Sequence, residues 1–158
     1  MLEVPVRYPL EEAPLTSNTR ATTDSTTARR ARNPLYNAVI GLTALAILLQ
    51  GLWAGLFLRD DGKAPGAESW VDVHARGGDI AILLAAVATV VAFWKLRRRR
   101  DLWAGSAVLT VLLVLEAYLG GLIRDEHVGS LTAVHVPLAM AIMGLVIWLP
   151  VRATHRHE

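Results

Sequence analysis

Four long apolar segments divide the sequence. They comprise residues 37–58, 77–94, 102–123 and 128–151, and none of them contains more than one Asp, Glu, Lys or Arg. A helix of about 20 mostly apolar residues is long enough to cross the hydrocarbon core of a bilayer. The pattern therefore predicts an all-α protein, an integral membrane four-helix bundle that covers residues 35–151.

Polar residues gather before, between and after these segments. Residues 1–34 are rich in Thr, Ser, Pro and charged side chains, and they contain no apolar stretch of the kind found in a secretory signal. Such a segment buries too little apolar surface to offset the entropy lost on ordering. We therefore expect residues 1–34 to form a disordered N-terminal tail, and residues 152–158 to form a short tail after the last helix.

The overall composition narrows the class of protein. Hydrophobic residues make up 53% and charged residues 19% of the 158 residues, whereas a soluble domain carries about 45–50% apolar and about 25% charged residues. An ordinary soluble enzyme is therefore excluded, and so is a wholly disordered chain. The absence of cysteine excludes disulfides, thiolate catalysis and cysteine-ligated clusters.

The basic residues predict how the helices are oriented. They concentrate before the first helix, between the second and third, and after the fourth: Arg29, Arg30, Arg32, Lys95, Arg97, Arg98, Arg99, Arg100, Arg152 and Arg156. Short connections rich in Lys and Arg stay in the cytoplasm, so we expect a multi-pass protein of the cell membrane with both tails cytoplasmic. Because the basic excess is local to these connections, the net charge of +2 does not indicate a nucleic-acid partner.

Two stretches of the sequence resemble each other. Residues 50–61 begin with glutamine, have a glycine five residues later and end in Arg-Asp-Asp, while residues 116–126 begin with glutamate, have a glycine five residues later and end in Arg-Asp-Glu. In each case the next helix is entered through a Val-His pair, at His74 and at His135. This order predicts two parallel two-helix repeats, related by a pseudo-twofold axis along the membrane normal.

The two histidines are the candidate metal ligands. His74 is expected to open the second helix, and His135 is expected about two turns into the fourth. A bundle would place these two helices diagonally or side by side, and two imidazoles that face each other across a bundle are the usual axial ligands of a b-type haem. The alternative is that each histidine forms a hydrogen bond with a neighbouring helix.

Three further residues carry charge near the histidines. Arg59 and Arg124 occupy matching ends of the first and third helices. Because arginine pairs well with carboxylates, both are candidate ligands of the haem propionates; alternatively, each pairs with the acidic residue that follows it. Glu116 lies within the third apolar segment, where it would either relay protons or contact a neighbouring helix.

With these residues in view, the sequence resembles one half of bacterial haem A synthase, an eight-helix protein built from two four-helix halves. The resemblance covers about residues 36–150 and implies that His74 and His135 ligate a haem. The chain also resembles small four-helix actinobacterial membrane proteins that have no settled activity. It contains only one half of the synthase, has Val71 where the catalytic half has glutamate, and lacks the synthase cysteine pair, so we do not expect a stand-alone enzyme.

These observations lead to three hypotheses of function. The first is a membrane protein that binds one haem b through His74 and His135, for electron transfer or haem handling with a partner from the respiratory chain or the haem pathway. The second is a cofactor-free accessory subunit of a membrane complex. The third is a small proton-coupled transporter that uses Glu116 and acts as a homodimer.

Overall fold

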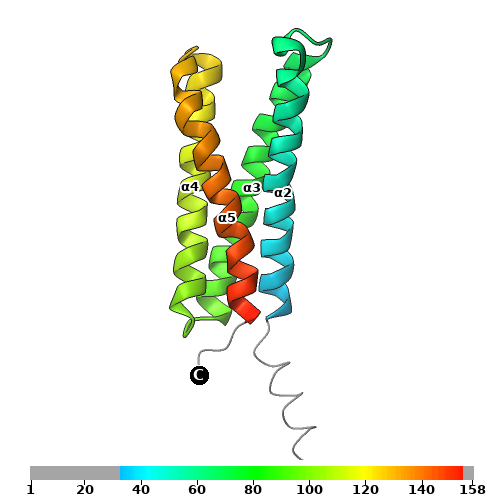
Figure 1. Ribbon diagram of the computed structural model, residues 1–158. Helices are drawn as coiled ribbons and strands as arrows, with labels where there is room; N and C mark the ends of the chain where they lie inside the picture. The colour runs from blue at the N-terminus through cyan, green and yellow to red at the C-terminus, as the bar shows by residue number, and fades with distance from the viewer. Residues whose placement is uncertain (1–32, 155–158) are drawn as a thin grey trace, which may run out of the picture. The chain divides into compact units, whose positions relative to one another are not determined.

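The computed structural model describes residues 33–154, and it folds them into four long helices (Figure 1). These are α2 (Pro34–Leu58), α3 (Ala67–Lys95), α4 (Arg100–Asp125) and α5 (Thr132–Thr154), with the short 3-10 helices η1 (Arg59–Gly62) and η2 (Gly129–Leu131) in two of the connections. Each long helix has the length and apolar composition needed to cross a membrane. The predicted all-α bundle with four membrane spans is confirmed, whereas residues 1–32 and 155–158 of the predicted tails lie outside the described residues.

Helix α2 begins slightly ahead of its predicted apolar segment. The Asn33 side chain accepts a hydrogen bond from the backbone N–H of Tyr36 at 3.1 Å, and Pro34 occupies the first turn. Both residues are favoured where helices begin, because the Asn side chain satisfies a free backbone donor and proline has no N–H to leave unpaired. Pro34 therefore belongs to the helix, not to the predicted tail.

Helix α3 begins well ahead of its predicted apolar segment. It starts at Ala67, directly after Gly66 in the left-handed conformation (φ 81°), whereas the apolar pattern begins at residue 77. The backbone hydrogen bonds of a helix do not require apolar side chains, so α3 includes the charged residues that precede the apolar segment. The expectation that His74 opens this helix is therefore wrong, because His74 lies about two turns inside α3.

Successive helices are neighbours, and α5 completes the bundle by packing against α2. Each helix thus has two neighbours, which leaves α2 diagonal to α4 and α3 diagonal to α5. The sequence left open whether the helices of His74 and His135 lie side by side or diagonally. In the structure, they lie diagonally.

The buried apolar core occupies only one half of the bundle. This half leads to the basic end, formed by the start of α2, residues 96–99 and the end of α5, while residues 59–66 and 126–131 form the opposite end, here called the histidine end. Counted from the basic end, the buried core extends no further than Ile47, Ala81, Leu113 and Ile142. Figure 1 shows the α2–α3 pair and the α4–α5 pair converging toward the basic end and diverging toward the histidine end.

Two side-chain hydrogen bonds connect helices within this core. The Tyr36 hydroxyl lies 3.0 Å from Oγ of Ser106, across the diagonal between α2 and α4. Oγ1 of Thr89 lies 3.1 Å from Oγ1 of Thr110, between α3 and α4. Because lipid tails offer no alternative partner, hydrogen bonds of this kind help to fix the arrangement of membrane helices.

A charged cluster joins α4 to α5 at the basic end. Asp101 accepts hydrogen bonds from Arg99 at 2.9 Å and from Arg152 at 3.1 Å, and Arg99 also donates to the backbone carbonyl of Arg152 at 2.8 Å. The hydrogen bond to Asp101 raises the pKa of the Arg99 guanidinium above its ordinary value. One carboxylate between two guanidinium groups thus connects the start of α4 to the last turn of α5.

Candidate functional site

His74 contacts the neighbouring helix α2 through a backbone atom. Its Nδ1 lies 3.1 Å from the carbonyl oxygen of Gln50, and its ring meets the Phe57 ring edge-on at a centroid distance of 5.4 Å. A carbonyl oxygen can only accept a hydrogen bond, so Nδ1 carries the proton. In a neutral imidazole, the lone pair that can bind a metal then resides on Nε2.

Gly77 allows α2 and α3 to approach closely beside this contact. A β-carbon at Gly77 would overlap the Trp53 ring and the Gln50 amide, which fill the space above the glycine. Only a residue without a side chain permits this packing. The close approach keeps Gln50 within reach of His74, which lies one turn earlier on α3.

His135 contacts α4 through a side chain. Its Nδ1 lies 3.2 Å from Oε1 of Glu116, and the two side chains are 20% and 13% exposed. The distance is that of an ion pair, but the alignment is not that of a hydrogen bond, so Nδ1 and both carboxylate oxygens remain buried without a hydrogen-bond partner. Gly120, one turn after Glu116, lies against the same imidazole: a β-carbon there would stand 3.3 Å from Cε1 of His135.

The two histidines share one region of the bundle. They come from the diagonal helices α3 and α5, and both lie on the histidine-end side of the buried core. Each ring uses Nδ1 to contact the helix that precedes its own in the chain, at Gln50 or at Glu116. Among residues 33–154, no hydrogen bond engages Nε2 of either ring.

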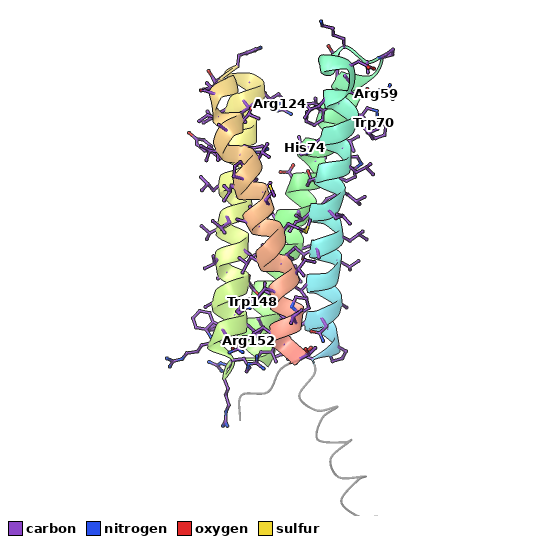
Figure 2. The ribbon with its side chains drawn as sticks, in the orientation of Figure 1. Arg59, Trp70, His74, Arg124, Trp148 and Arg152 are labelled. Carbon is purple, nitrogen blue, oxygen red and sulfur yellow. The ribbon has the colours of Figure 1, made fainter. Side chains whose placement is uncertain are left out.

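The two arginines lie at the histidine end and pair with acidic residues next to them. Arg59 lies 3.3 Å from Asp60 with its side chain 61% exposed. Arg124 lies 2.7 Å from Asp125 and 4.0 Å from Asp72 of α3, with its side chain 46% exposed. Figure 2 shows His74 a short way into the bundle from both arginines. In the structure, both arginines are therefore surface residues, and each pairs with the acidic residue that follows it in the sequence.

The donor set of this region is small. Within the part of the chain that the structure describes, no three His, Cys, Asp or Glu side chains converge as they would around a bound metal ion. His74 and His135 are thus two nitrogen donors without a third side-chain ligand. A metal ion held here would need most of its ligands from another source.

Sequence reasoning did not find the contacts made by Phe57, Gly77 and Gly120. The adjacent glycines at 120 and 121 are a signal that could have been followed, because helix interiors disfavour glycine unless another group comes close. No protein-family model, curated protein or solved structure matches the sequence.

Proposed function

We propose that this multi-pass membrane protein binds one haem b, with His74 and His135 as its axial ligands. The observation that carries the proposal is the similar placement of the two imidazoles: Nδ1 of each ring faces an oxygen atom of the preceding helix. Nδ1 of His74 donates a hydrogen bond to the Gln50 carbonyl oxygen, and Nδ1 of His135 lies 3.2 Å from the Glu116 carboxylate. Neither Nε2 has a hydrogen bond within the described residues. A histidine that ligates a metal usually has its other ring nitrogen fixed in this way, by a backbone carbonyl or a carboxylate.

The diagonal arrangement and the extent of the core support the same proposal. Haem sites in helical bundles are built from side chains of facing helices in the interior, and α3 and α5 face each other diagonally. The buried apolar core stops before it reaches His74 and His135. Beyond it lie polar atoms of Glu116 and His135 that are buried without hydrogen bonds, and ionisable residues inside membrane segments commonly mark functional sites.

The donor set favours haem over a bare metal ion. Two histidines without a third side-chain ligand are too few for a structural or catalytic metal centre, which generally takes three or four protein ligands. A porphyrin provides four nitrogen ligands itself and leaves two axial positions for the protein. When bound, haem would supply a one-electron redox centre, suited to electron transfer or to haem handling with a respiratory-chain or haem-pathway membrane protein.

Several finer features belong to this proposal. The α2–α3 and α4–α5 pairs would be two parallel repeats, with Gln50 and Glu116 in equivalent positions. Arg59 and Arg124, which lie at the histidine end, would exchange their acidic neighbours for the haem propionates. The chain would belong with the small membrane proteins that resemble one half of haem A synthase, and it would reside in the cell membrane with both termini cytoplasmic.

The test is an absorption spectrum of the detergent-purified full chain, produced with ample haem and recorded before and after reduction with dithionite. We expect the sharp α and β bands of a low-spin bis-histidine haem, and we expect both His74→Ala and His135→Ala to lose them. The matched control is His127→Asn, because His127 is exposed in the connection before α5 at φ 57°, a conformation that Asn tolerates. Full bands in either alanine variant would refute the ligand assignment.

The cofactor-free accessory subunit remains the second candidate, because the same contacts of His74 and His135 also serve as interhelical contacts. It predicts a colourless protein that takes up no added haem. It also predicts that both alanine variants lower the free energy of unfolding, by about 0.6 kcal/mol each. The spectrum of the unmodified chain therefore separates the two candidates.

A further inference from the structure

Asp79 lies on the face of α3 that no other helix covers. The buried positions of α3 form one line along the helix, which includes Ala81, Ala85 and Ala88. Asp79 is two residues before Ala81, so it projects from the opposite side, and it is exposed. Arg76, Leu83 and Val90 are also exposed on this opposite side, and Ala86 between them is partly exposed.

The depth of Asp79 makes this exposure unusual. Tryptophans at membrane interfaces mark the two edges of a span, and Trp70 and Trp94 of α3 lie about 36 Å apart along the helix. The hydrocarbon core between such edges is about 30 Å thick. Asp79 lies about one turn from the midpoint between the two tryptophans, and therefore within the hydrocarbon layer. The early start of α3 at Ala67 is what moves Asp79 from the edge of the span to its middle.

Neither Asp79 nor the neighbouring Arg76 has an ion-pair partner among residues 33–154. Ionised side chains that face lipid near the middle of a bilayer are costly, so such residues almost always face a protein interior, a water-filled cavity or each other. The side of α3 that carries them faces away from the bundle. The partner of Asp79 must therefore come from outside this set of helices.

We propose that this face of α3 packs against the same face of a second copy of the chain. Its residues, which we call the α3 seam, are Arg76, Asp79, Leu83, Ala86 and Val90. They alternate at intervals of three and four residues, the spacing of helices that pack along a common line in the left-handed geometry. A twofold axis along the membrane normal would place each residue at the height of its equivalent in the other copy.

Charge complementarity identifies a second copy as the occupant. Arg76 and Asp79 are opposite charges about 4.5 Å apart along the helix axis, a step that an arginine side chain can span. Arg76 of each copy would pair with Asp79 of the other, so the interface would contain two equivalent ion pairs and no unpaired charge. Lipid tails offer no charged partner for either residue. In addition, the small side chain of Ala86 within the α3 seam allows the two helices to come close.

Cross-linking through a single introduced thiol tests the interface, because the chain has no cysteine of its own. We expect Leu83→Cys to form a disulfide-linked dimer in native membranes under mild oxidation. Equivalent residues facing each other along such a seam lie within the distance that a disulfide spans. The control is Val114→Cys, at a similar depth on α4 and also exposed to the surroundings. Cross-linking at neither position, or equally at both, would overturn the proposal, and so would linkage of Leu83→Cys to a different protein.

Exchange of the two charges tests the pairing itself. In the Leu83→Cys background, Asp79→Arg alone and Arg76→Asp alone each place like charges across the interface, so we expect each to reduce the dimer yield by more than half. The combination of Arg76→Asp with Asp79→Arg restores opposite charges and should restore the yield. Single exchanges that cross-link fully, or a double exchange that does not recover, would overturn the reciprocal ion pairs. None of these results depends on whether haem is bound.

Discussion

Gly120 of α4 lies directly against the imidazole of His135. A β-carbon at position 120 would stand 3.3 Å from Cε1 of the ring, closer than most real contacts of a β-carbon, whereas position 121 has no other side chain within 4 Å. The two adjacent glycines of α4 therefore differ in whether a neighbouring side chain occupies the space that a β-carbon would need. Gly120 leaves room for the histidine beside Glu116, and Gly121 faces open space.

This difference makes the two glycines a matched pair for mutagenesis. We expect Gly120→Val to displace the His135 ring and to weaken haem binding about 10-fold or more, as changes that disturb the orientation of a ligand generally do. Gly121→Val introduces the same side chain one position later and should leave haem affinity unchanged. Haem titration followed by absorption measures both. Equal affinities for the two variants would show that the position of His135 does not matter for binding.

Glu116 is expected to orient His135 through its side-chain oxygen. Its Oε1 lies 3.2 Å from Nδ1 of the ring, and glutamine keeps an oxygen at that place while leucine does not. We therefore expect Glu116→Leu to lower haem affinity by about 10- to 100-fold, and Glu116→Gln to lower it less. The same titration compares them. Should the leucine variant bind haem as tightly as the unmodified chain, the carboxylate has no role in holding the ligand.

The hydrogen bond between Tyr36 and Ser106 should stabilise the basic half of the bundle. Tyr36→Phe removes the hydroxyl that lies 3.0 Å from Ser106, and hydrogen bonds between membrane helices contribute about 0.6 kcal/mol on average and up to about 1.7 kcal/mol. We expect a loss of this size in the free energy of unfolding, measured by denaturation in mixed micelles. Tyr118→Phe is the control, because Tyr118 is exposed. If the control loses a similar amount, the loss comes from removing a tyrosine hydroxyl from solvent or detergent, and the hydrogen bond to Ser106 does not stabilise the bundle.

The four helices could be predicted from the sequence because the requirement is local. About 20 apolar residues and few charges are enough to identify a membrane span, whatever the rest of the chain does. The start of α3 could not be placed in this way, since a helix can continue beyond the apolar run through residues such as Glu68 and Asp72. That extension decides the depth of His74 and Asp79. An error in a helix boundary thus became an error about the position of His74, a candidate haem ligand.

The candidate site could be predicted only in part. His135 and Glu116 are recognisable as polar residues in apolar segments, and His74 as the match of His135 in the repeated Val-His pair. The contacts of all three depend on how the helices pack. His74 meets the backbone carbonyl of Gln50, and no side-chain pattern marks a carbonyl that every residue possesses. Likewise, Gly120 acquires its role only when α5 brings His135 against it. The diagonal position of α3 and α5 follows from packing of the whole bundle, not from any one segment.

The orientation in the membrane is open to direct measurement, since a chain without cysteine can be labelled at one chosen site. Lys63 lies in the connection at the histidine end and Arg98 in the connection at the basic end, and both are exposed. Because loops rich in Lys and Arg stay in the cytoplasm, Lys63→Cys should react with a membrane-impermeant maleimide in right-side-out vesicles and Arg98→Cys only in inverted ones. Ser130→Cys, at the histidine end on the other helix pair, should behave as Lys63→Cys does. The reverse pattern would place the histidine end in the cytoplasm, whereas opposite results for positions 63 and 130 would contradict the four-span topology.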